Sequence, residues 1–274
     1  MTTAQPLRPP IGQLVRQWRR QRRLSQLELS LDADISTRHL SFVETGRSLP
    51  SRDMILRLAD QLDLPPRERN HLLLAGGYAP VYAETELDSP NMAEVRAAVR
   101  KVLSAHEPYP ALVVDRGWNI VDANPSLALF TEGVAAELLK PPINALRVAL
   151  HPQGMAGRIV NLGEWRAHLL SRVRRQYAAV RDPVLAQLLA ELRTYPNGQP
   201  EPDLELPGPG DIFVNLRIRH AGAELAFFST VSTFGAPLDI TVAELAIESF
   251  FPADAATAFA LRNDQADASR RPLY

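Results

Sequence analysis

The sequence predicts two domains, an all-α domain of five helices followed by an α+β domain. Apolar residues recur at helical spacing through residues 11–75, without the strict alternation that is typical of strands. After residue 108, alternating apolar runs occur before and after a long helical stretch. Between the two patterns, the segment GGYAPVYAETELDSP is rich in glycine, proline and acidic residues, which is typical of a link between domains. We place the boundary near residue 80.

The composition indicates a chain with substantial cores. Of its 274 residues, 46% are hydrophobic, which is enough for one large or two ordinary domains. The absence of cysteine excludes a disulfide framework and a cysteine-rich zinc site. No apolar run reaches the roughly 18 residues of a membrane span, and the start MTTAQPLRPP lacks the pattern of a signal peptide. We therefore expect a cytoplasmic location and no membrane partner.

Charge is unevenly distributed along the chain. The formal net charge is -1, but residues 1–80 contain 12 arginines and 8 acidic residues, a net charge of +4 that leaves -5 for residues 81–274. A basic surface favours contact with a polyanion. We therefore expect a nucleic-acid partner, if there is one, to bind the first domain.

The stretch LSQLELSLDADISTRHLSFVETG, Leu24 to Gly46, predicts two short helices joined by a tight turn. Ser25 and Glu28 have the spacing of a capping box, so the first of these helices begins there. Ser36 is placed to cap the second helix. A turn of three or four residues between two helices is helix-turn-helix spacing, in which the second helix enters the major groove of DNA.

A helical wheel assigns the faces of this second helix. At about 100° per residue, Leu40 and Val43 point inward and Phe42 points outward. Arg38 suits guanine O6 and N7, and the ring of Phe42 suits a thymine methyl group. The alternative for Phe42 is packing against a neighbouring loop. The residues that we expect to read the bases are Thr37, Arg38, Ser41 and Phe42, and Ser36 is a further expected DNA-binding residue at the start of the helix.

The second domain is expected to combine strands and helices. A helix predicted over 90–105 has Val95, Val99 and Val102 at helical spacing. Two hairpins are predicted, one with its turn at Arg116–Gly117 and one with its turn at Ala221–Gly222. The remaining predictions are helices within 161–180 and 182–198, a last strand within 243–251, and a disordered tail over 263–274.

Several phrases resemble known families. SQLELSLDADISTRHLSFVETGRSLPS is similar to the xenobiotic-response-element (XRE) class of helix-turn-helix, with Gln26 at the start of one helix and the ending Glu44-x-Gly46. The phrases STRHLSFVETGRSLPSRDMILRLADQLDLPPRERNHLLLAGGYAP, WNIVDAN, LHPQG and NLGEWRAHLL, in this order, resemble the MmyB-like transcriptional regulators. The resemblance covers nearly the whole chain. From the pattern along the chain we expect a linker and connecting helix over 81–108, followed by a domain over 109–262. The resemblance implies that this domain has a PAS-like fold and takes a fatty-acid-like ligand.

The resemblance to the XRE class also implies contacts with DNA phosphates. Gln26 would hold a phosphate at the amino end of its helix, where backbone N–H groups already favour an anion. Arg47, Ser48, Ser51 and Arg52 follow the second helix of the motif and are placed for the adjacent DNA backbone. For Arg47 and Arg52, the alternative is a solvated surface charge.

The second domain has no catalytic motif that competes with ligand binding. P-loop, dinucleotide-binding, zinc-protease and nucleophile-elbow motifs are absent, and the six histidines lack metal-ligand spacing, so we expect neither an enzyme nor a metal site. Large apolar residues are candidates for a ligand pocket, although each also fits a place in the core: Trp118, Phe130, Leu146, Trp165, Phe213 and Phe227. The candidate polar anchors at its mouth are Arg147, Asn161, Arg166 and His168.

These observations predict a DNA-binding transcription regulator that senses a small apolar ligand, a fatty acid by resemblance. We expect a homodimer on a double-stranded operator, because one small module makes few contacts and two would read half-sites about 34 Å apart. No cofactor is expected apart from a bound fatty acid. Two alternatives stay open: an enzyme that the first domain tethers to DNA, and a ligand-free regulator whose second domain only dimerises.

Overall fold

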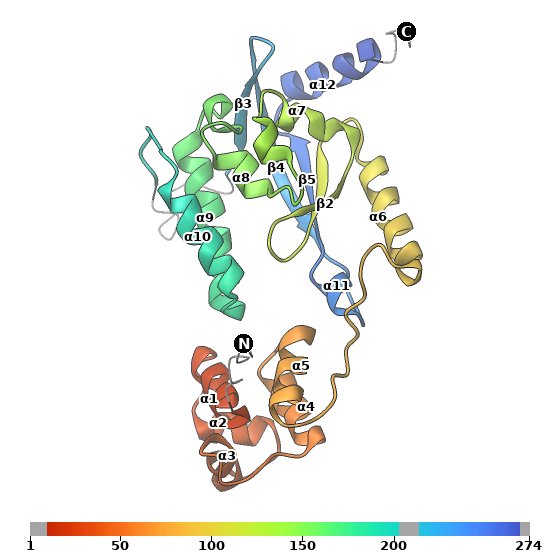
Figure 1. The fold of residues 1–274 in the computed structure, drawn as a ribbon. Coiled ribbons are helices and arrows are strands. Elements are labelled where there is room, and N and C mark those ends of the chain that lie inside the picture. The colour runs from red at the N-terminus through yellow and green to blue at the C-terminus, as the bar shows by residue number, and fades with distance from the viewer. Residues whose placement is uncertain (1–9, 203–213, 269–274) are drawn as a thin grey trace, which may run out of the picture. The chain divides into compact units, whose positions relative to one another are not determined.

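The computed structural model describes residues 10–202 and 214–268 (Figure 1). Within the chain, contacts define two compact units. The first unit runs to Glu86 and also contains Ala236–Ala243, whereas the second unit consists of Leu87–Gly235 and the chain from Glu244 onward. The domain limits inferred from the sequence stay predictions. Nothing in the sequence pattern indicates that residues 236–243 return to the first unit.

The first unit contains the five helices that the sequence predicts. They are α1 (Ile11–Gln21), α2 (Gln26–Asp32), α3 (Thr37–Glu44), α4 (Arg52–Gln61) and α5 (Pro66–Ala75). Each helix contributes fully buried apolar side chains to one core, among them Val15, Leu29, Leu40, Ile55 and Leu72. This shared core fixes α3 as part of a rigid helical unit.

Local signals in the sequence fix the helix-turn-helix. Ser25 Oγ accepts a hydrogen bond from the Glu28 N–H at 3.1 Å, and the Glu28 carboxylate accepts one from the Ser25 N–H at 2.7 Å, which confirms the capping box. Ser36 Oγ accepts from the backbone N–H of His39 at 3.1 Å, so α3 begins where the sequence predicts. A Cβ atom at Gly12 would lie 2.2 Å from the carbonyl oxygen of Val43, so glycine is what allows α1 this close to α3.

The segment Ala236–Ala243 connects two strands of the second unit but belongs to the first. It contains α11 (Ile240–Ala243), which packs against α5 and buries Ile240. The Ile240 N–H donates to the carbonyl oxygen of Ala83 at 2.8 Å, and Ala83 forms an isolated parallel bridge with Asp239. The chain that follows α5 therefore holds this segment in place.

The second unit contains a five-stranded antiparallel sheet with the strand order β2-β1-β5-β4-β3 (Figure 1). Its strands are β1 (Ala111–Val114), β2 (Ile120–Ala123), β3 (Leu216–His220), β4 (Ala223–Ser232) and β5 (Ala246–Pro252). Both predicted hairpins and the predicted last strand are confirmed. Because β5 lies between β1 and β4 in the middle of the sheet, most of its residues are buried on either face.

Helices cover both faces of the sheet (Figure 1). α6 (Ala93–Ala105) packs on the face that contains Val113 and Ile247. The opposite face, which contains Leu112 and Phe250, shares one core with α7 (Ala128–Thr131), α8 (Ala145–Leu150), α9 (Leu162–Val180) and α10 (Pro183–Thr194). This arrangement confirms the predicted α+β fold with a curled antiparallel sheet, of the PAS-like kind that the resemblance implies. Successive residues of β5 enter two different cores.

Two details differ from the sequence-based expectation. Leu103 is buried and completes the inner stripe of α6, whereas Val102 is 46% exposed. α12 (Ala255–Ala268) extends into the range predicted to be disordered, because Leu261 enters the main core and anchors the helix. Short 3-10 turns complete the described chain at Pro90–Met92, Pro125–Leu127, Ala136–Leu139 and Ala156–Arg158.

Candidate functional site

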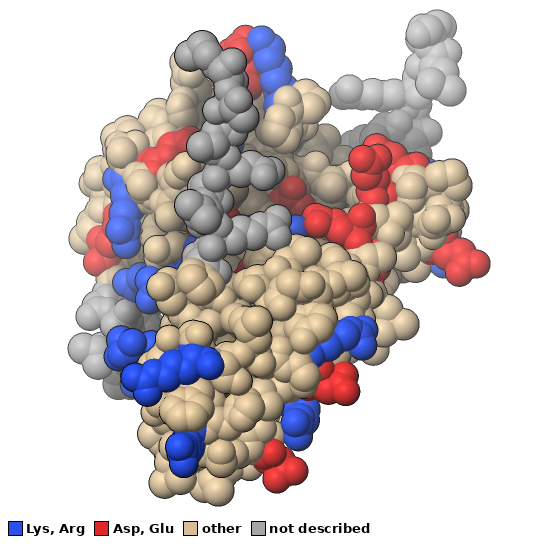
Figure 2. Space-filling model, turned by 60° about the horizontal axis from the view of Figure 1, so that its bottom comes forward, with Lys and Arg blue, Asp and Glu red and all other residues tan. Residues whose placement is uncertain are grey.

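The outer face of α3 is polar, as the helical wheel predicts. Leu40 and Val43 are fully buried, whereas Arg38 is exposed. Thr37 and Ser41 are half-buried on the same helix. In Figure 2 the end of the first unit that carries α3 comes forward, and basic side chains are spread over it among uncharged side chains and a few acidic ones. The helix therefore offers this face to a partner while its other face holds it in the core.

Phe42 lies outside the core of the first unit, and its ring contacts two arginines. The guanidinium carbon of Arg38 is 5.4 Å from the centre of the Phe42 ring, and that of Arg47 is 5.9 Å from it. The Phe42 carbonyl oxygen accepts hydrogen bonds from the N–H groups of Arg47 and Ser48, at 2.8 and 3.2 Å. The ring is half-buried because it packs against these cations and the loop that follows α3. The two interpretations of Phe42 are thus compatible, since an arginine of that loop covers the ring.

The carboxylate of Glu44, in α3, accepts hydrogen bonds from side chains of α1 and α2. Arg19 of α1 donates to both of its oxygens, at 2.6 and 2.9 Å, and Gln26 of α2 donates to Oε2 at 2.8 Å. Burial by itself raises the pKa of Glu44, but hydrogen bonds from Arg19 and Gln26, with the charges of Arg19 and Arg16, outweigh it and lower that pKa. Glu44 is therefore ionised at neutral pH and fixes the end of α3.

The residues predicted to contact phosphates lie at helix ends and in the loop after α3. Gln26 is half-buried, and its bond to Glu44 leaves one amide hydrogen for another acceptor. Ser51 caps α4 by accepting from the Met54 N–H at 3.3 Å, so its O–H can still donate. Arg52 is exposed at the start of α4, and Ser48 is half-buried. Contacts of all these residues with DNA stay predictions.

Thr37 has a partner within the first unit. Its Oγ1 atom lies 2.8 Å from Ser30 Oγ, at hydrogen-bond distance. Because Ser30 Oγ itself donates to the carbonyl oxygen of Leu27 at 2.8 Å, Thr37 is left as the donor of the pair. To donate to a DNA base, the Thr37 hydroxyl group would therefore have to give up its hydrogen bond to Ser30.

The second unit encloses an apolar cavity of about 60 Å³ beside its sheet. Four of the predicted ligand residues line it: Trp118, Phe130, Leu146 and Trp165. Other parts of the wall are Leu112, Ile120, Met155, Leu169, Leu216 and Phe250. An apolar cavity of roughly 150 Å³ can hold benzene, so this smaller cavity has room for only a few non-hydrogen atoms unless its walls move.

The other two predicted apolar residues are not in the cavity wall. Phe227 is fully buried on β4, and its ring meets that of Phe130 edge to face at 5.6 Å. Phe227 therefore packs against Phe130, which lines the cavity, without lining it itself. Phe213 lies outside the described residues.

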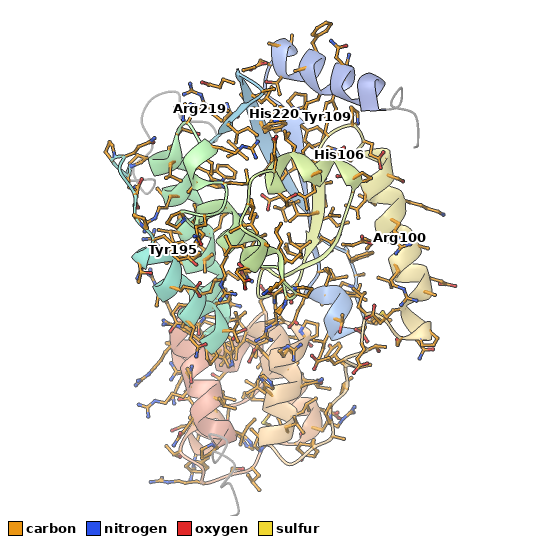
Figure 3. The ribbon with its side chains drawn as sticks, turned by 45° about the horizontal axis from the view of Figure 1, so that its top comes forward. Arg100, His106, Tyr109, Tyr195, Arg219 and His220 are labelled. Carbon is orange, nitrogen blue, oxygen red and sulfur yellow. The ribbon has the colours of Figure 1, made fainter. Side chains whose placement is uncertain are left out.

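Arg147 and Asn161, two of the predicted polar anchors, have partners away from the cavity. Arg147 makes a two-pronged ion pair with Glu191, at 2.8 and 2.7 Å. Glu191 also accepts from the hydroxyl group of Tyr195 at 2.6 Å, just beyond α10 (Figure 3). Asn161 donates to the Glu164 carboxylate at 2.7 Å and to a backbone carbonyl at 2.8 Å. Neither residue lines the cavity.

Arg166 and His168, the other two predicted anchors, also lie outside the cavity wall. Arg166 forms an ion pair with Glu201 and donates to the carbonyl oxygen of Arg193 at 3.0 Å. His168 stacks on Trp165 with ring centres 5.2 Å apart. Burial, with the charges of Arg172 and Arg175, lowers the pKa of His168 to about 4, so its ring is neutral at pH 7.

Glu248 of β5 is a charged wall residue that the sequence analysis missed. Its side chain is buried, and its Oε1 atom accepts from Arg172 Nη1 at 2.7 Å and from Ser229 Oγ at 3.0 Å. The guanidinium group of Arg172 lies over the Trp118 ring, 4.7 Å from its centre. The signal was present in the strand AIESFF, because a glutamate between Ala246 and Phe250 falls on their face of the sheet.

The described ranges contain no group of three or more His, Cys, Asp or Glu side chains that could hold a metal ion. Within those ranges, no helix is both long and apolar enough to cross a membrane.

The two units are each matched by a protein-family description. A helix-turn-helix domain matches residues 10–72, and the "MmyB-like transcription regulator ligand binding domain" matches residues 95–263. Together they define a DNA-binding transcription regulator with a ligand-binding domain. Because the second match covers more than half of the chain, the chain belongs to the MmyB-like transcription regulator family.

Solved structures that are similar to part of this chain were also found. The restriction-modification controller protein C.AhdI from Aeromonas hydrophila is 36% identical over 22% of this chain and 89% of that chain, with a TM-score of 0.21. A comparison with curated proteins gives no match.

Proposed function

We propose that this regulator binds a specific operator as a homodimer and changes its affinity for that operator when an apolar ligand enters the cavity of the second unit. The observation that carries the DNA-binding part is the outer face of α3, where the guanidinium groups of Arg38 and Arg47 both lie over the Phe42 ring. Under this proposal the second unit binds its ligand and does not transform it.

The arrangement of the α3 face supports a division of roles. Arg38 is exposed on the helix itself, so it reads a guanine, and the Phe42 ring beside it contacts a thymine methyl group. Arg47 lies in the loop after α3 and neutralises a phosphate. Because the ring holds both arginines by cation–π contact, less side-chain freedom is lost when they meet DNA.

Contacts with the DNA backbone would position this face. Gln26 donates its remaining amide hydrogen to a phosphate at the start of α2. Ser36 and Ser51 donate their hydroxyl hydrogens at the starts of α3 and α4, beside Ser48 and Arg52. In a homodimer the same set is presented twice, to half-sites about 34 Å apart.

The apolar cavity supports the ligand-sensing part of the proposal. The aromatic residues Trp118, Phe130 and Trp165 come from the hairpin and from two helices, so a ligand would touch several elements at once. A medium or long fatty acid, which the resemblance implies, needs the walls to separate beyond the present volume of about 60 Å³. Ligand entry would therefore change the packing of α7, α8 and α9 on the sheet.

A paired titration of the full chain tests this function. Fatty acids and alcohols of increasing chain length are titrated against the protein, and operator affinity is measured at each concentration. Each buried methylene contributes about 0.8 kcal/mol, so ligand affinity should rise with length until the cavity is full and then fall. The operator affinity should change over the same concentration range in which the ligand binds.

A cavity-filling variant makes the test specific. Ala149 lines the cavity, so Ala149→Leu should abolish ligand binding and the response while operator binding without ligand persists. The matched control is Ala136→Leu, at an exposed position outside the wall, which should keep the response. If Ala149→Leu responds like the original chain, the cavity is not the sensing site.

A further inference from the structure

Glu248 is the charged side chain in the wall of the apolar cavity. We propose that the cavity selects a small apolar ligand that ends in a neutral hydrogen-bond donor, such as a hydroxyl group, and that Glu248 Oε2 accepts this hydrogen bond. This proposal rests on the proposed function, because it concerns the same ligand site, but it replaces the fatty acid that the resemblance implies by an apolar ligand with a neutral head group.

Glu248 occupies a position whose surroundings on the sheet are apolar. It lies on the central strand β5, opposite Leu112 of β1, and its neighbours on the cavity side are Ala246 and Phe250. Only 5% of Glu248 is exposed. A buried carboxylate is strongly unfavourable unless other groups compensate it. We therefore expect Glu248, at the centre of this face, to make a polar contact that an apolar residue could not make.

The hydrogen bonds of Glu248 leave one side of the carboxylate open. Both donors, Arg172 Nη1 at 2.7 Å and Ser229 Oγ at 3.0 Å, bind Oε1. Oε2 accepts no hydrogen bond from any residue in the described ranges. An ionised carboxylate has acceptor sites on both oxygens. Oε2 is not among the fully buried unpaired side-chain atoms of the described residues, so it keeps some accessible surface, and a donor on a ligand that enters the cavity can bind it.

Charge balance selects a neutral donor. The ion pair with Arg172 already compensates the charge of Glu248, and Arg172 is itself held over the Trp118 ring. A ligand carboxylate would bring a second negative charge against Glu248 in a medium of low dielectric constant. A ligand ammonium group would bring a second positive charge near Arg172. A hydroxyl group supplies the missing hydrogen bond and leaves the balance unchanged.

Three probes of similar size test this chemistry on the full chain. Butanol carries a donor, methyl propyl ether has the same atoms without a donor, and butanoate carries a negative charge. Each is titrated at pH 8, and binding is followed by the NMR signals of the Trp118 and Trp165 indoles, which line the cavity. Butanol can donate a hydrogen bond to the charged Glu248 carboxylate, so it should bind about 10-fold more tightly than the ether or butanoate. Equal binding of butanol and the ether, or stronger binding of butanoate, overturns the proposal.

A variant of Glu248 provides a second measurement. In Glu248→Gln the amide oxygen keeps the bond from Arg172, so the NH2 group takes the place of Oε2 and offers a donor. The preference for butanol over the ether should then disappear, and butanoate should bind better than it does to the original chain. Glu224→Gln is the control, because Glu224 is an exposed residue of β4 paired with Arg217, and it should keep the original order.

The outcomes separate this proposal from the proposed function. If all three probes bind alike and change operator affinity alike, the donor preference is wrong and ligand sensing stands. If butanol is preferred and operator affinity does not change, the donor preference stands and ligand sensing is wrong. If no probe binds, the donor preference is wrong, and the chain-length titration of the proposed function decides on ligand sensing. Should Glu248→Gln fail to fold, the comparison of the three probes on the original chain decides alone.

Discussion

The Asp239 carboxylate accepts two hydrogen bonds from Thr85, 154 residues earlier in the chain. The backbone N–H and the hydroxyl group of Thr85 both donate to Asp239 Oδ2, at 3.1 and 2.7 Å. Oδ1 accepts from the Thr241 N–H at 2.8 Å and so begins α11. The connection between β4 and β5 is thereby fixed to the first unit. Since β5 carries Glu248 and Phe250 in the cavity wall, the chain itself links the ligand cavity to the DNA-binding unit.

We predict that loosening this attachment uncouples the ligand from DNA. Thr85→Val removes the hydroxyl donor and keeps the side-chain shape, so the segment 236–243 should open more readily. Butanol should then bind as before, but its effect on operator affinity should shrink, because a ligand acts only through a difference between two states. The effect is measured as the ratio of operator dissociation constants with and without butanol.

The control for this prediction is Thr230→Val, at an exposed position on β4, which should leave that ratio unchanged. An undiminished ratio in Thr85→Val would show that the Thr85–Asp239 contact has no part in the coupling.

A second prediction concerns Glu44 and pH. Its pKa is lower in the folded state than its ordinary value of 4.5, so its contribution to stability is present in full above 4.5 and is lost as the pH falls through the lowered pKa. Glu44→Gln leaves the charge of Arg19 buried without its partner and should cost about 3–5 kcal/mol at pH 7. The free energy of unfolding is measured for both proteins from pH 7 to pH 3.

The difference between these two proteins should narrow as the pH falls. A difference that stays constant over this range would mean that the Glu44 charge does not contribute to stability. Glu68→Gln, a carboxylate on α5 that contacts His71, is the matched control with a small expected effect.

A third prediction separates the two interpretations of Phe42. Because the ring lies outside the core and contacts Arg38 and Arg47, Phe42→Ala should cost about 1 kcal/mol of stability or less. A ring buried in the core would cost about 3–5 kcal/mol. If the ring contacts a thymine methyl group, affinity should fall more for the operator than for random DNA. Thermal unfolding and DNA titrations give the two quantities, and a large loss of stability with equal losses on both DNAs would rule out the reading role.

Residues with local causes could be predicted from the sequence. Ser25, Glu28 and Ser36 act within one turn of helix, so their spacing alone indicates their caps. The inward position of Leu40 follows from helical periodicity in the same way. The hairpins follow from alternating runs around a turn. In each case the partner lies a few residues away, where the sequence specifies the geometry.

Long-range pairs could not be predicted in this way. Arg19 looks like one surface arginine among five, and only the fold brings it to Glu44. Arg147, Asn161 and Arg166 find partners away from the cavity. His168 stacks on the wall residue Trp165 but does not itself line the cavity, whereas Glu248 does. The bond between Thr85 and Asp239 depends on a loop that leaves one unit and joins the other. Sequence periodicity indicates which face of a helix or strand a residue occupies. It does not indicate which residues of other elements that side chain contacts.

The central claim is that α3 reads DNA sequence, and enrichment of bound duplexes from a random pool tests it most directly. The original chain should enrich one sequence with two half-sites about one helical turn apart. Arg38→Ala should lose about 1–3 kcal/mol at that sequence and relax a single position in each half-site, whereas Arg47→Ala should weaken binding to all sequences alike. Enrichment of no sequence, or an unchanged sequence and affinity for Arg38→Ala, would contradict the assignment of α3 as the recognition helix.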